Sequence, residues 1–229
     1  MDRQEFLAQL PKLVAGYKPA SDVIERIGQI KVLMLVGPSG VGKTTLVNNL
    51  GLKYVLSDNT RDPRPGELEG RDFFFRTDYD MVAEEIRRGR FVQVAVDSGG
   101  DLKATKASSY PNSGDVVMAI VADVVPIFRQ LGFAATTTAF ITPPSFGEWM
   151  QRMQSHNLSQ EQFRKRIDEA KRSFNFALAD QAVHFILSDT VEAATNQLKQ
   201  LVSGQPDTER EAIARAAAVS INTQLGEMD

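Results

Sequence analysis

One glycine-rich segment of the chain ends with a lysine and a threonine. Its eight positions read Gly37, Pro38, Ser39, Gly40, Val41, Gly42, Lys43 and Thr44. They fit the pattern G-x-x-x-x-G-K-[ST], in which glycines let backbone N–H groups surround an anion, the lysine reaches the terminal phosphates and the hydroxyl binds Mg²⁺. We therefore predict that this segment, together with Thr45, binds Mg²⁺ and the phosphates of ATP or a close relative.

The sequence on either side of this segment favours a binding loop over a chance glycine-rich turn. Four fixed positions of this kind recur by accident in roughly one chain in a hundred of this size. Here the apolar run Lys31–Val36 precedes the glycines and has the pattern of a strand buried on both faces. The helix-like run Thr45–Leu50 follows them. A strand and a helix are the flanks that a phosphate-binding loop requires.

A second group of cations follows in the loop Ser57–Glu67. Arg61 and Arg64 stand beside Pro63 and Pro65, which exclude a helix interior. Arginine presents a planar pair of donors to phosphate oxygens, so the loop could hold the phosphate of an acceptor. The alternative is a solvated charged turn.

These motifs occur in an order that resembles the guanylate kinase family. The similarity runs from the glycine-rich segment through Thr60–Glu67 and Glu69–Phe75 to Phe140–Ser145, and covers roughly residues 31–203. The resemblance implies an α/β fold of the P-loop three-layer type with a parallel core sheet, an inserted acceptor-nucleotide domain and a helical lid. It also implies ATP-dependent phosphoryl transfer to a nucleoside monophosphate.

The resemblance further implies domain limits and roles for individual residues. The acceptor part would span about residues 57–110 and the lid about residues 147–172. Arg61 and Arg64 match arginines that bind the acceptor phosphate, and Ser57 matches a serine that contacts guanine. In the lid, Arg152 and Arg166 match arginines that act with Lys43 on the transferring phosphoryl group. Both lid arginines could equally lie on a solvated helix face.

Several positions depart from the family pattern on the acceptor side. Gln93 stands where the family carries a glutamate that reads guanine, and an amide accepts at one end but donates at the other. Phe73 replaces a phosphate-binding tyrosine. The loop Gly99–Ala104 lacks the usual tyrosines, and its hydroxyl survives only if an insertion brings Thr105 into place. We therefore leave the acceptor open between GMP and a nucleotide with another base.

A carboxylate pair near the metal is also missing. The family's D-x-D positions read Ala119 and Val121, while Asp123 comes two residues later. Thr44 is then the one protein ligand that the sequence predicts for Mg²⁺, which commonly keeps water and phosphate ligands.

Two other functions remain open. The lost acceptor contacts would suit a catalytically weak ATP-binding regulatory module. The arginines would also suit a kinase whose acceptor is another small phosphorylated molecule. We favour the nucleoside monophosphate kinase, because both phosphate-binding motifs are retained.

The elements that must position these residues follow from the apolar pattern. Runs at residues 91–96, 116–121, 140–142 and 184–187 predict further strands of a βαβ-wound sheet. Residues 1–30 and 204–229 predict helical extensions. In the second extension Asp207 or Thr208 would cap a helix with an apolar face formed by Ala212, Ile213, Ala216 and Ala217. These terminal helices could form a homodimer or cap their own domain.

Composition bounds the remaining possibilities. The 229 residues are 42% hydrophobic and 24% charged, with a net charge of −3 and no cysteine. This balance argues against binding to nucleic acid or to a membrane and favours a cytoplasmic protein with nucleotide substrates as its partners. The start of the chain is too charged for a signal peptide. We assign no chemistry to His156 and His184. Trp149 and the phenylalanines at 73–75 could stack on a base, but aromatic residues at such spacing are more often core residues, so we expect them in the core.

Overall fold

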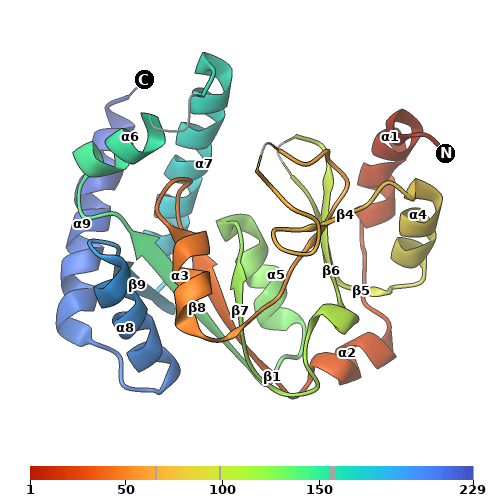
Figure 1. Cartoon of the computed structure of the whole chain (residues 1–229), viewed down its shortest axis with the longest axis horizontal. Coiled ribbons are helices and arrows are strands. Elements are labelled where there is room, and N and C mark those ends of the chain that lie inside the picture. The colour runs from red at the N-terminus through yellow and green to blue at the C-terminus, as the bar shows by residue number, and fades with distance from the viewer. Residues whose placement is uncertain (65, 98, 155–157, 229) are drawn as a thin grey trace. The chain divides into compact units, whose positions relative to one another are not determined.

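The structure is a computed structural model that describes residues 1–64, 66–97, 99–154 and 158–228 (Figure 1). The α-helices are α1 (Arg3–Val14), α2 (Ser21–Ile27), α3 (Lys43–Leu50), α4 (Tyr79–Arg87), α5 (Val125–Gln130), α6 (Phe146–Gln154), α7 (Gln160–Ala179), α8 (Val191–Val202) and α9 (Thr208–Gly226). The strands are β1 (Ile30–Val36), β2 (Lys53–Tyr54), β3 (Asp58–Asn59), β4 (Phe74–Phe75), β5 (Phe91–Val96), β6 (Leu102–Lys106), β7 (Gly114–Ala119), β8 (Ala135–Thr142) and β9 (Val183–Leu187). Short 3-10 helices are η1 (Ala107–Ser109) and η2 (Ala122–Val124).

The chain divides into two compact units. The first unit consists of Met1–Val32, Lys53–Val116 and Pro126–Thr136. The second unit consists of Leu33–Leu52, Val117–Val125 and Thr137–Asp229. Each unit contains one of the two loops that the sequence predicts to bind phosphate.

The larger sheet has the strand order β2-β7-β1-β8-β9. β8 and β9 pair in parallel from Thr138 opposite Val183 to Thr142 opposite Leu187. β1 is buried along nearly its whole length, as its continuous apolar sequence predicts. The α/β fold with a parallel core sheet is therefore confirmed.

A second, smaller sheet has the order β4-β3-β6-β5. β3 pairs with β4 in parallel, whereas β6 pairs with both β3 and β5 in the antiparallel sense. The prediction that residues 91–96 belong to the wound sheet is wrong, because these residues form β5 of the smaller sheet. The short connection to β6 explains the difference, since neighbouring antiparallel strands need no crossover helix.

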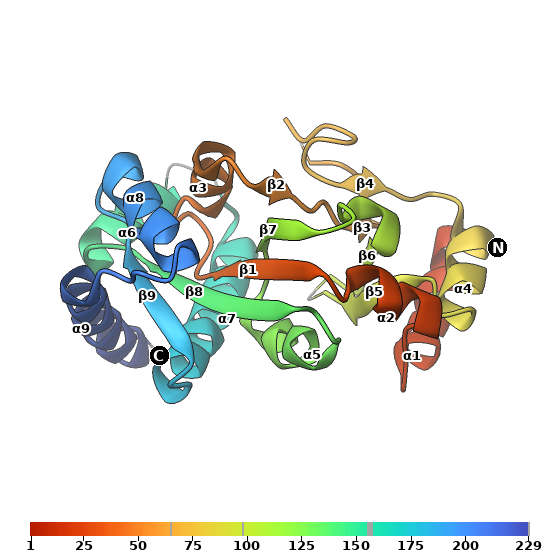
Figure 2. The same ribbon diagram turned by 90° about the horizontal axis from the view of Figure 1, so that it is seen from below.

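Two helices build the core of the first unit against this smaller sheet. Phe6 and Leu10 of α1 are fully buried with Val82 of α4 and with Phe91 of β5. α1 and α4 lie side by side in both ribbon views (Figures 1 and 2). The first residues of the chain are therefore part of the core of this unit.

Helix α9 packs against β9 and α7 within the second unit (Figure 1). Asp207 caps it by accepting from the Arg210 backbone N–H group at 3.0 Å. The predicted apolar face is wrong, since Ile213 is 51% exposed. The buried side chains are instead Ala214, Ala218, Ile221 and Leu225. Their spacing of three and four residues forms one stripe, which begins one turn after the contacts of Arg210 and Glu211.

Among the described residues, no helix has both the length and the apolar character needed to cross a membrane.

Candidate active site

The glycine-rich loop joins β1 to α3 in the second unit. Gly37 has φ 144°, and a Cβ there would lie 2.7 Å from the backbone oxygen of Ile141 in β8. Gly42 has φ 96° and is the N-cap of α3. Both positions require glycine, because other residues rarely adopt these backbone angles and a Cβ at Gly37 would collide with β8. These two glycines thus form the turn that leads directly into the N-terminus of α3, the end of a helix that attracts anions.

Lys43 begins α3 directly after this turn. Its Nζ donates to the carbonyl oxygens of Gly37 at 2.5 Å and Pro38 at 3.0 Å. Thr44 and Thr45 follow in the first helical turn, and both are exposed. An ammonium group and two hydroxyls therefore lie at the positive end of the helix dipole, which favours bound anions.

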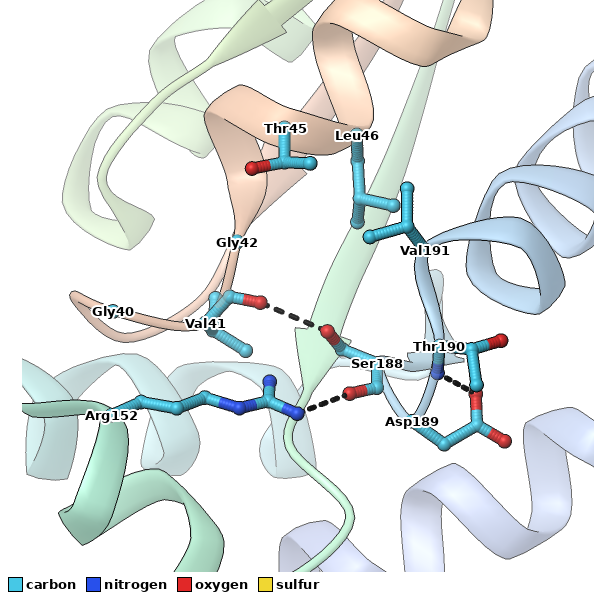
Figure 3. Close-up of a pocket in the computed structure, with 10 residues that line it drawn as sticks. All are labelled: Gly40, Val41, Gly42, Thr45, Leu46, Arg152, Ser188, Asp189, Thr190 and Val191. Carbon is cyan, nitrogen blue, oxygen red and sulfur yellow. Dashed lines mark hydrogen bonds between the residues drawn. The ribbon is translucent and has the colours of Figure 1, made fainter.

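A pocket of about 220 Å³ adjoins this loop (Figure 3). Its lining residues are Gly40, Val41, Gly42, Thr45, Leu46, Arg152, Ser188, Asp189, Thr190 and Val191. The Oγ of Ser188 donates to the backbone oxygen of Val41 at 2.9 Å and so joins the loop after β9 to the glycine-rich loop. Our sequence reasoning missed the four residues from Ser188 to Val191. Their position at the carboxyl end of a core strand was a signal that could have indicated them.

Helix α6 is fixed to the glycine-rich loop by Trp149. This side chain is fully buried, and its Nε1 donates to the backbone oxygen of Ser39 at 2.9 Å. Trp149 is a core residue, as expected. Arg152 lies one turn further along α6, and its Nη2 donates to the backbone oxygen of Ser188 at 3.1 Å (Figure 3). Of the two arginines predicted for the lid, Arg152 lines the pocket, whereas Arg166 is half-buried on α7 and does not line it.

The arginine loop of the first unit already holds a carboxylate. Arg61 donates from Nη1 and Nη2 to the two oxygens of Glu67, both at 2.7 Å. Its side chain is 13% exposed, and its guanidinium carbon lies 5.2 Å from the centroid of the Phe73 ring. Burial acts to raise the pKa of Glu67, but the bonds from Arg61 and from the backbone N–H of Arg64 hold that pKa below its usual value. The guanidinium thus presents the two parallel donors that bind planar or tetrahedral anions.

Other residues predicted for the acceptor lie near this pair. Arg64 is exposed, and its backbone N–H donates to Glu67 at 2.8 Å. The Nζ of Lys103 lies 5.2 Å from the centroid of the Phe73 ring, so cations from two segments of the chain lie beside this ring. Ser57 is half-buried, and its backbone oxygen accepts from the N–H of Phe74 at 3.0 Å.

Gln93 lies in β5 with a side chain that is almost completely buried. Its Oε1 has no hydrogen-bond partner among the described residues. Thr105 of β6 is opposite Gln93 in the sheet, and its Oγ1 lies 3.4 Å from the hydroxyl of Tyr110. Burial raises the pKa of that tyrosine. An unpaired buried acceptor is costly in a folded protein, and a ligand N–H group would satisfy it.

The described residues contain no cluster of three or more histidine, aspartate or glutamate side chains that could hold a metal. Asp123 lies on η2 with a side chain 69% exposed, 3.9 Å from Arg172. His184 contacts Glu211 at 3.2 Å, and His156 falls outside the described residues. At the start of α3 the exposed side-chain oxygens are the hydroxyls of Thr44 and Thr45, and so small a set would fit Mg²⁺ that takes most of its ligands from nucleotide phosphates and water.

Comparisons of this chain with known proteins all find similarity to one family. The sequence profile described as guanylate kinase matches residues 29–205. A guanylate kinase of Corynebacterium efficiens is 29% identical over 184 residues, which cover 76% of this chain and 95% of that protein. A guanylate kinase of Nostoc sp. is 31% identical over 183 residues, which cover 76% and 90%.

The solved structures agree at the level of the fold. The crystal structure of guanylate kinase from Anaplasma phagocytophilum matches with a TM-score of 0.57 and 20% identity. The match covers 81% of this chain and 90% of that one.

Proposed function

Because the chain belongs to the guanylate kinase family, we propose that it transfers the terminal phosphoryl group of ATP to a nucleoside monophosphate. The observation that carries this proposal is the glycine-rich loop at the start of α3, with the Nζ of Lys43 at its backbone carbonyls and Arg152 on the adjoining pocket. Phosphoryl transfer needs positioning and positive charge more than covalent chemistry, and this loop supplies both.

On the donor side, the backbone N–H groups of the loop would hold the phosphates of ATP. The residues concerned are Gly37, Ser39, Gly40, Val41 and Gly42. The Nζ of Lys43 would move from the loop carbonyls to the transferring group, and Thr45 would support the adjacent phosphate. Thr44 would bind Mg²⁺, which supplies additional positive charge when present. Arg152 and Arg166 would stabilise the charge that develops on the phosphoryl oxygens.

On the acceptor side, Arg61 and Arg64 would bind the phosphate of the monophosphate. The carboxylate of Glu67 accepts two N–H···O bonds from Arg61, as two phosphate oxygens would. Phosphate would therefore compete with Glu67 for one guanidinium. Phe73 offers no hydroxyl to that phosphate, so the arginines would contribute most of its affinity.

The base would be read by Ser57 and Gln93. Guanine presents two neighbouring donors, N1–H and the 2-amino group, to a reader such as a carboxylate. The amide of Gln93 has one acceptor and one donor, so it complements a base edge that pairs a donor with an acceptor. We therefore propose that GMP is bound less selectively than by a glutamate, or that another base is preferred.

The test is incubation of the chain and Mg·ATP with GMP, dGMP, AMP, IMP, CMP and UMP in turn, with ADP formation as the readout. We expect ADP formation that depends on one of these acceptors and disappears in Lys43→Ala. Transfer to GMP would establish a guanylate kinase, and transfer to another member would identify the changed base. Retained ATP binding without transfer to any of them would contradict the proposal and favour an ATP-binding regulatory module.

A further inference from the structure

Two terminal segments lie outside residues 29–205, which match the family profile. We call residues 1–28 the N-terminal segment and residues 206–228 the C-terminal segment. Each sends one arginine to an aspartate at a proposed nucleotide site. We propose that these arginines are positioning residues, Arg3 for the acceptor site and Arg210 for the ATP site. The inference rests on the proposed function.

Arg210 lies in the first turn of α9. Its Nη2 lies 2.8 Å from Oδ1 of Asp189, and the same oxygen accepts from the backbone N–H of Thr190 at 2.7 Å. Asp189 and Thr190 both line the pocket beside the glycine-rich loop (Figure 3). The C-terminal segment therefore fixes one wall of the proposed ATP pocket from outside it.

Arg3 holds a buried aspartate in the first unit. Its Nη2 lies 2.8 Å and 2.9 Å from the two carboxylate oxygens of Asp101, whose side chain is 7% exposed. Oδ1 of Asp101 accepts from the hydroxyl of Thr60 at 3.2 Å, and that hydroxyl accepts from the backbone N–H of Leu102 at 2.9 Å. Thr60 directly precedes Arg61. A short chain of contacts thus joins the N-terminal segment to the backbone that carries the acceptor arginine.

Tyr17 makes a second contact from the N-terminal segment to the acceptor site. Its hydroxyl donates to the backbone oxygen of Phe91 at 2.5 Å and accepts from the backbone N–H of the same residue at 2.8 Å. β5 is an edge strand of the smaller sheet, and Gln93 lies two residues after Phe91. The segment therefore pairs with backbone groups of the strand that carries the proposed base reader.

The two ion pairs share an unpaired donor. The Nε of Arg3 and the Nε of Arg210 are both buried, and neither has a hydrogen-bond partner among the described residues. A lysine would supply the positive charge without leaving that donor unpaired. What arginine adds is a rigid planar group that fixes the direction of the aspartate. Since each pair acts within its own unit, loss of one arginine should affect one substrate.

The experiment measures binding of two probes to Arg3→Ala and Arg210→Ala by calorimetry. The probes are Mg²⁺ with the non-hydrolysable analogue AMP-PNP and, separately, the member of the monophosphate panel that the wild-type chain binds most tightly. Arg210→Ala should weaken AMP-PNP binding by about tenfold and change monophosphate binding less than twofold. Arg3→Ala should weaken monophosphate binding by about tenfold and change AMP-PNP binding less than twofold. Arg3→Lys and Arg210→Lys should each keep part of the affinity that the alanine variant loses.

The chain offers a matched control in each segment. Arg26 of the N-terminal segment contacts Asn112, and Arg215 of the C-terminal segment contacts the backbone oxygen of Leu178. Arg26→Ala and Arg215→Ala should leave both affinities unchanged. If Arg3→Ala unfolds because Asp101 stays buried and unpaired, the double variant Arg3→Ala with Asp101→Asn removes that charge and is measured instead.

Equal loss of both affinities together with a lower melting temperature would overturn the inference, since the arginines would then serve folding alone. The inference would also be overturned if both variants kept the affinities of the wild-type chain, or if the wild-type chain bound neither AMP-PNP nor a monophosphate. The reciprocal pattern without any turnover would support positioning and contradict the proposed kinase activity instead.

Discussion

In the proposed function, the glycine-rich loop and the base side of the acceptor region would recognise their ligands with different groups. The loop would act mainly through backbone N–H groups, so it depends on glycine at positions such as Gly37, where a side chain would collide with β8. The acceptor region would act through side chains, and Gln93, Phe73 and the loop Gly99–Ala104 differ there from the residues that the family resemblance leads us to expect. Backbone recognition leaves little freedom to substitute, whereas side-chain recognition allows specificity to change while the fold is kept.

A further distinction applies within the acceptor region itself. Arg61 remains, and it holds the carboxylate of Glu67 in the geometry expected for a phosphate. The side chains that would read a base have changed. These features predict that phosphate binding is retained in both units while base selectivity differs, and four predictions test this statement.

The largest effect should come from the donor side. Lys43→Ala removes the charge nearest the transferring group, so kcat should fall by about a thousandfold. Circular dichroism and the melting temperature should stay close to those of the wild-type chain. Lys31→Ala, an exposed lysine of β1, is the control and should keep its activity. Equal activity in Lys43→Ala and wild type would remove the loop from the mechanism.

On the acceptor side, Arg61→Ala should raise the KM for the monophosphate by about thirtyfold, because a charge-assisted pair of hydrogen bonds is lost. The KM for ATP should change little. Arg61→Lys should recover only part of the loss, since lysine keeps the charge without the planar pair of donors. A rise in the KM for ATP alone would place Arg61 outside the acceptor site.

Base selectivity should respond to Gln93→Glu. A carboxylate can accept from both guanine donors, so the ratio of kcat/KM for GMP to that for AMP should rise by about tenfold or more. Gln93→Ala should lower kcat/KM for all bases without favouring one. If neither substitution changes the ratio, Gln93 does not read the base.

The smallest effect concerns the pH dependence of stability through Glu67. Its pKa in the folded chain is held below the usual value, so its contribution is present above the unfolded pKa and is lost as pH falls through the folded one. Urea unfolding at pH 7 should show wild type more stable than Glu67→Gln by about 1 kcal/mol, and the difference should shrink as the pH falls below 4.5, the ordinary pKa of a glutamate side chain. A difference that grows in acid would contradict the lowered pKa.

The sequence could predict the features that depend on local pattern. The buried strand β1, the turn at Gly37 and Gly42, and a helix directly after that turn follow from residue types at fixed spacing, although α3 begins at Lys43, two residues before the predicted Thr45. The cap at Asp207 follows from the same kind of signal. These features are local, and their physical causes act within one turn or one strand.

Contacts between distant segments could not be read in this way. Trp149 meets the backbone oxygen of Ser39, and Asp101 meets Arg3, across about a hundred residues of sequence in each case. The placement of β5 in the smaller sheet depends on its pairing with β6, which apolar character alone does not specify. The buried stripe of α9 depends in turn on where its first ion pairs fix the helix. In each of these cases, contacts with residues that are distant in the sequence determine the structure.

The proposed function is that ATP bound at the glycine-rich loop transfers its terminal phosphoryl group to an acceptor held by Arg61. It is tested most directly by ³¹P NMR of one mixture of the chain, Mg·ATP and the monophosphate panel. With the wild-type chain, two nucleoside diphosphates should appear for each ATP consumed, one from ATP and one from the acceptor, without inorganic phosphate. This conversion should be lost in Lys43→Ala and strongly slowed in Arg61→Ala. One diphosphate and one inorganic phosphate for each ATP consumed would contradict the proposal.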